Sequence, residues 1–345
     1  MTPDISIIVV TFNGREQALL TLRSARDAVG EASVEWIVVD SGSTDGTPDA
    51  IARAFPDVVV VRSENRGFAA GNNVGLRMAR GRYVLLMNPD IEIQSGTLAE
   101  LVVEMDARPD VGIGSVVQVG TDGALQHSIR RFPSPVRDLG EALGASHWPI
   151  LAAQQELETR PAVYARECSV DWLVGAFLMA RREAVAAVGP MDEAFFLYSE
   201  EVDWCYRFRQ RGWDIRHLPT MTIIHHAGRR DRGDLMAQLA HSRKLFSQKH
   251  FSPRRSLQIR CALALGHVVR LVALSPRAAA GDRGARQRLR AEWRALMVQL
   301  GVSEPPYSGV QHGALASATV AVSDPRRPSA PASDGTHSAR ATVGQ

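Results

Sequence analysis

Apolar segments that end in short polar loops recur along the first part of the chain. Ile5 to Val10 is a run rich in β-branched residues, and it is followed by Thr11-Phe12-Asn13-Gly14. A helical stretch through about Val29 leads to a second apolar segment, Glu35 to Val39, and a third follows at Val58 to Arg62. Runs of this length and composition predict the buried strands of a parallel sheet.

The pattern continues beyond these segments. Tyr83 to Met87 is a further predicted strand, a helix is expected from Ser95 to about Asp106, and Val170 to Ala180 is again apolar. Glu200 to Arg211 is expected to be helical, whereas the region from about Gln118 to Glu167 has few periodic signals and is predicted to be an insertion or an acceptor-facing loop. Alternating strands and helices predict an α/β fold with a Rossmann-like, mostly parallel sheet flanked by helices. In such sheets, ligands bind outside the carboxyl ends of the strands, where these polar loops lie.

The 345 residues predict one large domain with appendages. We assign residues 1–250 to the α/β domain, residues 251–302 to a basic amphipathic helical extension, and residues 303–345, rich in Pro, Ser, Ala and Gly, to a disordered tail. Arginines are concentrated between Arg254 and Arg294, although the formal net charge of the chain is only +3. Because the chain lacks the alternating basic and aromatic pattern of a nucleic-acid face, this basic region favours an anionic membrane surface.

An apolar stretch lies within the extension, from Leu257 to Leu274. Arg260, His267 and Arg270 would fall along one stripe of a helix there, and charges within so short a run argue against a membrane-spanning helix. The stripe favours a helix that lies on the membrane surface. A helix packed on the α/β domain has the same pattern, so that alternative stays open.

Cysteine usage and the N-terminal residues bear on the cellular compartment. Cys168, Cys205 and Cys261 are odd in number and lack metal-ligand spacing, which predicts neither a disulfide framework nor a zinc site. Asp4 precedes the first short strand, and no basic segment leads into a long apolar stretch, so no secretory signal is predicted. We expect a cytoplasmic protein that is peripheral at the inner face of the cell membrane.

The loop after the second strand, Asp40-Ser41-Gly42-Ser43-Thr44-Asp45-Gly46, combines acidic and small residues. Asp40 and Asp45 could accept hydrogen bonds from a ribose or a base, as acidic residues at such strand ends do. Asp, Ser and Gly are also the residues that turns and helix caps need, so a purely structural role is equally compatible with this loop.

Asn65 to Gly75 is rich in glycine, but it lacks the Lys-Ser/Thr ending of a phosphate loop and the glycine spacing of a dinucleotide fold. Small residues let a backbone approach a ligand closely, and Arg66 could meet a diphosphate. The segment therefore indicates either a nucleotide-sugar contact or a plain helix N-terminus.

Two further strand ends carry candidate metal ligands. Asn88-Pro89-Asp90 puts a carboxylate on a short turn after a buried strand, where it could hold Mg²⁺ or Mn²⁺ while phosphate oxygens complete the coordination. His225-His226 follows the apolar run Met221 to Ile224, and a histidine there could join the metal or the diphosphate. Taken alone, the first motif is more often a simple turn and the second a satisfied polar residue.

Three carboxylates lie beside an aromatic cluster between Phe195 and Arg207. Glu200, Asp203 and Arg207 share one face of the predicted helix, which is compatible with a structural salt bridge. Glu201 points elsewhere. A carboxylate at a helix start beside apolar rings can have a raised pKa and can act as a general base on a sugar hydroxyl.

In their order along the chain, these motifs resemble the family 2 glycosyltransferases with the GT-A fold, in particular the rhamnosyltransferase-like branch. The resemblance covers roughly residues 5 to 250, the predicted catalytic domain. It is carried by Val9-Val10-Thr11-Phe12-Asn13, Val38 to Gly46, Asn65 to Gly75, Asn88-Pro89-Asp90, Val174-Gly175-Ala176, Tyr198 to Arg207 and His225.

The resemblance implies a role for each matching residue. Nucleotide-sugar binding falls to Thr11, Asn13, Asp40, Ser41, Asp45, Arg66, Gly67, Asn72 and Asn88. Among them, the residues near the nucleoside would be Thr11, Asn13, Asp40 and Asp45, and those near the diphosphate or the sugar would be Arg66 and Asn72. A magnesium or manganese ion would be bound by Asp90 and His225. The catalytic candidates are Glu201 as the general base, Glu200 and Asp203.

The resemblance also implies an inverting enzyme that transfers a sugar in one step, without a covalent intermediate. We expect the sugar to be rhamnose from deoxythymidine-diphospho-rhamnose, and the acceptor to be a polysaccharide or a polyprenyl-linked glycan of the cell envelope. The alternatives are a transferase that uses UDP-galactofuranose or a UDP-hexose, and a catalytically inactive nucleotide-sugar-binding protein. A nucleotidyltransferase is disfavoured because Thr11-Phe12-Asn13-Gly14 is not basic.

Three departures from the family pattern affect these assignments. Glu200-Glu201 stands where many relatives have Glu-Asp, so Glu200 competes with Glu201 for the role of base. The metal motif keeps only its last carboxylate, Asp90. Arg229 and Arg230 stand where relatives often have a serine, after the histidine-glycine element.

Overall fold

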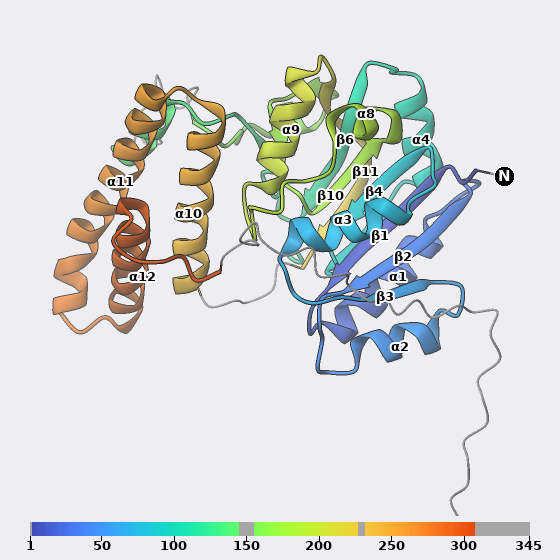
Figure 1. Ribbon diagram of the computed structural model, residues 1–345, viewed down its shortest axis with the longest axis horizontal. Helices are drawn as coiled ribbons and strands as arrows, with labels where there is room; N and C mark the ends of the chain where they lie inside the picture. The colour runs from blue at the N-terminus through green and yellow to red at the C-terminus, as the bar shows by residue number, and fades with distance from the viewer. Residues whose placement is uncertain (1, 145–154, 227–231, 308–345) are drawn as a thin grey trace, which may run out of the picture.

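The computed structural model describes residues 2–144, 155–226 and 232–307, which form an α/β domain with a helical bundle beside it (Figure 1). The bundle consists of α10 (Arg232–His250), α11 (Pro253–Ala279) and α12 (Arg283–Leu300). The predicted disorder of residues 308–345 and the departure at Arg229 and Arg230 lie outside the described residues.

The α/β domain is built on a mixed sheet. Within the described residues its nine strands follow the order β3-β2-β1-β4-β10-β6-β11-β5, with β8 beside β11. Their bounds are β1 Ile5–Thr11, β2 Val34–Asp40, β3 Val59–Arg62, β4 Tyr83–Met87, β5 Ile91–Ser95, β6 Val111–Val119, β8 Cys168–Ser169, β10 Phe177–Arg181 and β11 Asp214–His225. The strands β1, β2, β3, β4, β6 and β11 run in one direction, and β5, β8 and β10 run in the other. The predicted α/β fold with a mostly parallel sheet is confirmed.

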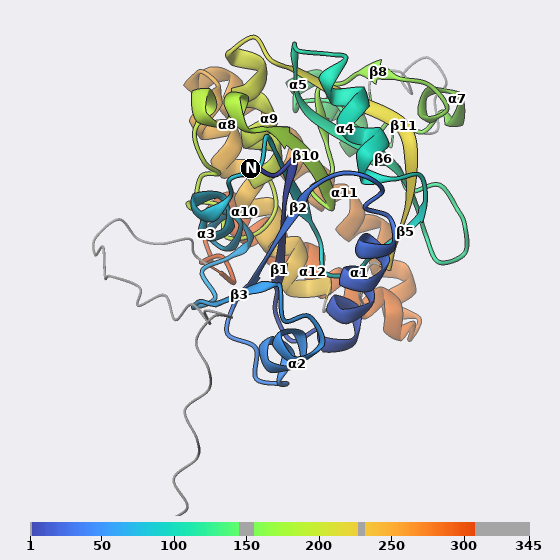
Figure 2. The same ribbon diagram turned by 90° about the vertical axis from the view of Figure 1, so that its right-hand side faces the viewer.

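Helices cover both faces of this sheet (Figure 2). One face packs on α1 (Arg15–Asp27), α2 (Thr47–Ala54) and α4 (Leu98–Asp106), and the other packs on α3 (Phe68–Met78), α8 (Arg182–Val188) and α9 (Glu200–Gln210). Alternate residues of β1 belong to the two cores, because Ile7 shares a core with Leu22 of α1 and Ile8 shares the other with Phe208 of α9. A strand buried on both faces needs apolar residues at successive positions, which explains its continuous apolar run.

The helix expected from Ser95 begins three residues later, at Leu98. Ile91–Ser95 is instead the strand β5, which pairs with β11 at the edge of the sheet. Thr97 and Glu100 form a capping box that fixes the start of α4.

The region from 118 to 180 contains more structure than predicted. The apolar stretch from Val170 holds β9 (Trp172–Leu173) and then β10, separated by a turn at residues 174–176. The loop-rich region holds β7 (Ile129–Arg130), α5 (Pro135–Ala142) and α7 (Pro161–Tyr164), while residues 145–154 lie outside the described ranges.

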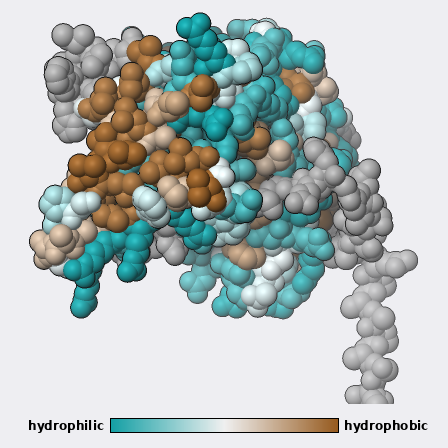
Figure 3. All heavy atoms as spheres, turned by 60° about the vertical axis from the view of Figure 1, so that its left-hand side comes forward, coloured by the Kyte–Doolittle hydropathy of each residue, from teal (hydrophilic) through white to brown (hydrophobic). Residues whose placement is uncertain are grey.

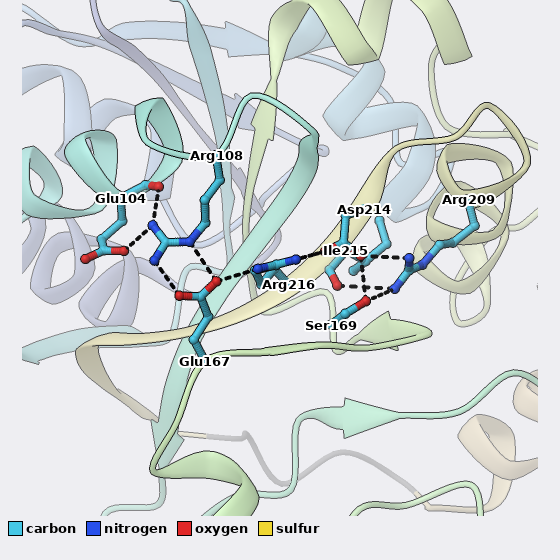
Figure 4. A network of polar contacts seen from close by, with 8 residues as sticks. All are labelled: Glu104, Arg108, Glu167, Ser169, Arg209, Asp214, Ile215 and Arg216. Atoms are coloured by element: carbon cyan, nitrogen blue, oxygen red, sulfur yellow. Dashed lines mark hydrogen bonds and ion pairs between the residues drawn. The ribbon is translucent and has the colours of Figure 1, made fainter.

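A chain of ion pairs joins β6, β8, β11 and α9 at the amino ends of β6 and β11 (Figure 4). Glu167 binds Arg108 and Arg216, and Asp214 binds Arg216 and Arg209. The hydrogen bond from Arg108 is the main reason that the pKa of Glu167 falls to about 2. Because this network lies at the end of the strands opposite the polar loops, it has a structural role.

Two residues of the predicted charged stripe of the extension, His267 and Arg270, bind α12. His267 Nδ1 lies 2.6 Å from Glu292 Oε2 of α12, and Arg270 Nε lies 2.7 Å from Glu292 Oε1. The backbone carbonyl of Arg260 accepts a hydrogen bond from Gln299 of α12 at 3.5 Å. His267 and Arg270 therefore pack α11 against α12, and the expected contact of this helix with a membrane surface stays a prediction. Among the described residues, α11 is the one helix long and apolar enough to cross a membrane by length and composition.

Helix α10 attaches the bundle to the α/β domain. Ser242 Oγ donates a hydrogen bond to the carbonyl oxygen of Leu197 at 2.8 Å, and Lys249 Nζ lies 2.6 Å from Asp192 Oδ2. Both contacts reach the segment that precedes α9. The bundle therefore holds the backbone that leads to the predicted general base.

Candidate active site

The loops after β1 and β2 are locked together at the carboxyl ends of these strands. Thr11 Oγ1 donates to Asp40 Oδ2 at 3.1 Å, and Asp40 Oδ1 accepts from the backbone N–H of Ser43 at 2.9 Å. Asn13 has a left-handed φ of 49°, and its Oδ1 accepts from the N–H of Thr44 at 2.8 Å. The structure thus brings Thr11, Asn13 and Asp40 together in one pair of loops.

Asp45 holds the start of α2. Its carboxylate accepts hydrogen bonds from the N–H and the hydroxyl of Thr47, at 3.0 and 2.5 Å, and from the N–H of Arg15 at 3.3 Å. The bond from the Thr47 hydroxyl is the main reason that the pKa of Asp45 is lowered. Asp45 therefore performs the structural role considered for this loop, and its contact with a nucleoside stays a prediction.

Two glycines at the N-terminal end of α3 allow it to pack closely on neighbouring segments. Gly67 has a φ of 95°, and a Cβ there would lie 2.2 Å from the carbonyl oxygen of Phe196. A Cβ on Gly71 would lie 2.7 Å from Val10 Cγ1 and 3.5 Å from Ser41 Oγ. The N-terminal turn of α3, which carries a partial positive charge, therefore packs on the ends of β1 and β2 beside Ser41.

The two remaining candidates of this segment differ in exposure. Asn72 is buried, and its Nδ2 donates to the carbonyl oxygen of Phe68 at 3.0 Å within α3. The side chain of Arg66 is 43% exposed and pairs with Glu193 at 3.0 Å. Arg66 is thus accessible to a ligand, whereas Asn72 is held within the helix packing and its contact with a ligand stays a prediction.

Asn73, which is not among the residues predicted from the sequence, joins α3 to the segment before α9. Its Nδ2 donates to the carbonyl oxygen of Met191 at 2.8 Å and to Glu193 Oε1 at 3.1 Å, and its Oδ1 accepts from the N–H of Met191 at 3.0 Å. The N–H of Phe68 adds a bond of 2.8 Å to the carbonyl oxygen of Phe196. The available signal was an asparagine inside a helix, where its side chain is unfavourable unless it has specific partners.

Asp90 and His225 lie together at the ends of β4 and β11. Asp90 Oδ1 is 3.5 Å from His225 Nε2. Gln126, which the sequence analysis did not single out, holds the histidine from the other side. Its Oε1 lies 3.1 Å from His225 Nδ1, and its Nε2 donates to the carbonyl oxygen of His225 at 3.0 Å. In the tautomer whose Nδ1–H donates a hydrogen bond to Gln126 Oε1, His225 Nε2 keeps a lone pair that can bind a cation beside Asp90.

The Asp90–His225 pair supplies fewer ligands than a closed metal site needs. In residues 2–144, 155–226 and 232–307, no group of three or more His, Cys, Asp and Glu side chains could hold a metal ion. Hard cations at nucleotide sites use one or two carboxylates and take their remaining ligands from phosphates and water. The pair therefore fits a cation that arrives with, or is completed by, a diphosphate.

The turn between β9 and β10 connects the end of β4 with the start of α9. The N–H of Asn88 donates to the carbonyl oxygen of Ala176 at 2.9 Å. A Cβ on the adjacent Gly175 would lie 3.4 Å from Glu201 Cβ. Asn88 precedes Asp90 by two residues, so Asp90 and Glu201 lie at the same edge of the sheet, on either side of this turn.

Of the two glutamates at the start of α9, Glu200 is buried and Glu201 is half-buried. Glu200 is 4% exposed, and Oε2 of each glutamate is buried without a hydrogen-bond partner among the described residues. Burial raises the pKa of Glu201 to about 7, while the nearby charge of Arg130 opposes this shift. Burial and the charge of Glu201 raise the pKa of Glu200. The pair resists double ionisation near neutral pH, and its ionised member has the proton affinity of a general base.

The backbone ahead of this pair is strained. Tyr198 and Ser199 have φ values of 69° and 64°, in the left-handed region that favours glycine. Each such residue costs about 1–2 kcal/mol, and surrounding contacts must compensate. The bonds from Asn73, Phe68 and Ser242 to the segment just upstream supply such contacts.

Asp203, the third carboxylate, is fully buried and bound by three side chains. It contacts Arg207 at 2.8 Å and both Lys249 and His250 at 2.6 Å. Burial alone raises its pKa, but the hydrogen bond from His250 and the charges of Arg207 and Lys249 outweigh burial and lower the pKa to about 2. The predicted salt bridge between Asp203 and Arg207 is present.

The strand order and the polar loops gathered at the carboxyl ends of the strands define an α/β protein with a GT-A-type fold. Its family follows from comparison with known proteins. The family model described as "Glycosyl transferase family 2" matches residues 6–187, more than half of the chain. The chain belongs to this family, and the predicted glycosyltransferase identity is confirmed.

Relatives in the family include rhamnosyltransferases. The chain is 28% identical over 256 residues to an N-acetylglucosaminyl-diphospho-decaprenol L-rhamnosyltransferase of Mycobacterium tuberculosis, covering 70% of this chain and 81% of that one. It is 24% identical over 170 residues to rhamnosyltransferase WbbL of Escherichia coli, covering 47% and 61%. The mannosyltransferase of Pyrobaculum calidifontis, solved with GDP-Man and Mn²⁺, has a similar fold, with a TM-score of 0.53 at 18% identity over 87% of each chain. The rhamnosyltransferase-like resemblance is therefore confirmed.

Proposed function

We propose that this glycosyltransferase moves rhamnose from deoxythymidine-diphospho-rhamnose, with inversion, onto a polyprenyl-linked or polysaccharide acceptor. The reaction would take place at the cytoplasmic face of the cell membrane, in the synthesis of an envelope glycan. The relative from Mycobacterium tuberculosis, whose name states a decaprenol-linked acceptor and L-rhamnose, supports the sugar and the acceptor class. The observation that carries the proposal is the pair Glu200 and Glu201, whose pKa values are raised by burial. The turn at residues 174–176 separates this pair from the strand end that bears Asp90.

In this proposal the donor lies along the carboxyl edge of the sheet. Thr11, Asn13, Asp40, Ser41 and Asp45 line its nucleoside end, and Arg66, Gly67, Asn72 and Asn88 line its diphosphate and sugar end. Arg66 can turn from its ion pair with Glu193 to the diphosphate, because both partners are on the surface of the site.

Asp90 and His225 would hold a divalent cation, Mg²⁺ or Mn²⁺, together with oxygens of the donor diphosphate. Such a cation, when bound, neutralises charge that develops on the departing diphosphate. Gln126 fixes the orientation of the His225 ring for this role.

Glu201 is proposed as the general base. Its carboxylate takes the proton of an acceptor hydroxyl while that oxygen attacks the anomeric carbon from the face opposite the diphosphate. The bond between the anomeric carbon and the diphosphate oxygen breaks in the same step, and the nucleotide leaves with the electron pair. Glu200, the competing candidate, raises the proton affinity of the pair, and Asp203 anchors α9 on α10 instead of touching substrate.

Substitution of Glu201 by Gln tests the assignment. Loss of a general base lowers turnover by about 10²- to 10⁴-fold, so transfer from deoxythymidine-diphospho-rhamnose to a lipid-linked acceptor analogue should fall by this factor. Donor affinity, measured by calorimetry in the presence of Mg²⁺ or Mn²⁺, should stay within about twofold of that of the parent protein. Loss of donor affinity would instead identify Glu201 as a binding residue.

A panel of nucleotide sugars separates the alternatives. Binding of UDP-galactofuranose or a UDP-hexose alone removes the rhamnose assignment and leaves the glycosyltransferase. Unchanged glycan in cells that carry both Glu201→Gln and Asp90→Asn favours the inactive sugar-nucleotide-binding protein.

A further inference from the structure

An apolar stripe faces outward along α11. The exposed residues Arg254, Leu257, Cys261, Leu265, Val268 and Val272 follow one another at spacings of three or four, which places them on one side of the helix. Val269 lies beside the stripe and is also exposed. This is the side away from His267 and Arg270, which bind α12. The outer side of α11 is thus apolar and the inner side carries the charges.

Helix α5 extends the stripe sideways. A Cβ on Gly266 would lie 3.4 Å from Ala142 Cβ, so α5 and α11 pack closely at this glycine. Next to Ala142, α5 and its end expose Leu139 and Leu143, and Val136 is exposed one turn earlier. We call the surface made by Val136, Leu139, Leu143, Leu257, Leu265, Val268, Val269 and Val272 the apolar face. In Figure 3, where the side of the molecule that carries the bundle comes forward, hydrophobic residues gather in one broad patch on the bundle.

The apolar face has no covering element among the described residues. In the most apolar part of α11, 22% of the residues are buried, although length and composition would suit a helix inside a membrane. Monomeric soluble proteins rarely leave large contiguous apolar patches exposed to water. A partner that offers apolar contact over the length of a long helix is therefore implied.

Helix α11 is not suited to leave the bundle and cross a bilayer. Glu292 is 5% exposed and bonded to both His267 and Arg270, so withdrawal of α11 would leave a buried carboxylate without its partners. The neighbouring α12 carries exposed arginines, including Arg286 and Arg288. The helix can meet lipid with its outer side only.

The net charge of the bundle indicates which kind of partner surface the apolar face would bind. Residues 251–302 contain ten arginines against Asp282 and Glu292, a balance of 10 − 2 = +8. Arg254 lies on the stripe itself, and Arg277 is exposed near the other end of α11. Arginine side chains can bury their stems in an apolar layer while their guanidinium groups reach phosphate oxygens. An apolar stripe within a basic surface is complementary to an anionic bilayer.

We propose that the apolar face docks on an anionic lipid bilayer, with α11 lying in the plane of the membrane surface. This deepens the proposed function, on which it rests for the lipid-linked acceptor that would be met at the same surface. The contacts of α10 with the segment before α9 connect the docked bundle to the glutamate pair. The docking surface is the side of α11 opposite to the charged stripe.

Sedimentation with sucrose-loaded vesicles tests the proposal on the full chain. We expect binding to vesicles of 70% phosphatidylcholine and 30% phosphatidylglycerol at least tenfold tighter than to pure phosphatidylcholine, and weaker binding at high salt. Leu265→Asp combined with Val268→Asp should reduce binding to the anionic vesicles at least tenfold. The matched control is Val103→Asp on α4, at a residue that is 67% exposed outside the apolar face, and it should bind as the parent protein does.

Two results would overturn the proposal. One is equal vesicle binding by the parent and the double variant. The other is absence of vesicle binding together with a dimer, seen by sedimentation equilibrium, that the double variant dissociates, because the apolar face would then be an interface between two copies. Unchanged circular dichroism and donor affinity in the double variant verify its fold. Vesicle binding without use of deoxythymidine-diphospho-rhamnose would refute the donor assignment and leave the docking surface in place.

Discussion

Glu201 and Glu200 obtain their properties from desolvation. No cationic side chain pairs with either carboxylate among the described residues, whereas Asp203, two residues beyond Glu201, is bound by Arg207, Lys249 and His250. The same helix turn therefore holds carboxylates with opposite pKa shifts. Those of Glu200 and Glu201 suit proton transfer, and that of Asp203 suits permanent ionisation in an ion-pair cluster.

The raised pKa of Glu201 predicts a pH dependence of transfer. The ionised form that acts as base predominates above its pKa of about 7, so kcat/KM should rise through a midpoint near pH 7 and level off above it. A pH–rate profile from pH 5.5 to 8.5 measures this, and a flat profile would contradict it.

The free energy of unfolding provides a control for this pKa, because ionisation of Glu201 favours transfer but destabilises the fold. A carboxyl whose pKa is 4.5 in the unfolded chain and about 7 in the folded protein stabilises the fold below pH 4.5, and this contribution is lost as the pH rises to 7. Glu201→Gln should therefore be more stable than the parent at pH 8, by roughly 1–3 kcal/mol, and show little difference at pH 5. Urea unfolding at the two pH values checks the difference.

At the scale of elements, the junction between β3 and α3 depends on a glycine. Gly67→Ala places a Cβ 2.2 Å from the carbonyl oxygen of Phe196 at a φ of 95°. We expect it to destabilise the fold by about 2–4 kcal/mol and to lower transfer, because α3 or the segment before α9 must move.

Gly46→Ala is the matched control for Gly67→Ala. Gly46 has a φ of 79°, but a Cβ there meets nothing within 4 Å. Its replacement should cost only about 1 kcal/mol, the cost of the left-handed backbone. Thermal unfolding of both variants separates the steric effect from the backbone effect, and equal losses would show that the contact with Phe196 is unimportant.

The sequence predicts those elements whose burial is continuous. The runs at β1, β2 and β4 are apolar at successive positions because helices cover both faces, and that pattern is visible without a structure. Strand β5 alternates apolar and polar residues over only five positions and depends on β11, more than 120 residues away in the sequence, so the sequence predicts no strand between Asp90 and the helix expected from Ser95. Non-local pairing of this kind has no local signal.

The residues of the candidate site also differ in whether the sequence predicts them. Asp90, His225 and Glu201 stand out because their residue types carry chemistry at strand and helix ends. Gln126 and Asn73 act through hydrogen bonds to residues 99 and 118 positions away, which residue type and spacing do not indicate. Likewise, the stripe of Arg260, His267 and Arg270 was recognised as one side of a helix, but the sequence could not say whether α12 or a membrane would cover it.

At the scale of the whole molecule, Glu292 decides how the bundle holds together. Glu292→Ala removes a buried carboxylate that binds His267 and Arg270, and we expect it to cost about 3 kcal/mol. The loss should loosen α11 from α12, so trypsin should cleave near Arg277 and Arg283 faster than in the parent protein.

Two measurements test whether the effect of Glu292→Ala is confined to the bundle. Donor affinity should not change, because Glu292 contacts none of the loops at the carboxyl ends of the strands. Arg288→Ala, at an exposed position of the same helix, should leave proteolysis outside its own site unchanged. A loss of donor affinity in Glu292→Ala would show that the bundle and the α/β domain unfold as one unit.

The bonds between α3 and the segment before α9 have a kinetic consequence. Asn73 and Phe68 tie the helix beside the donor loops to the backbone that carries Glu201. A nucleotide sugar that drew α3 inward would shift Glu201 with it, so the acceptor would encounter a reactive arrangement only after the donor had arrived. We therefore expect turnover to follow a compulsory order, in which the nucleotide sugar is the leading substrate and the free nucleotide is the last product to depart.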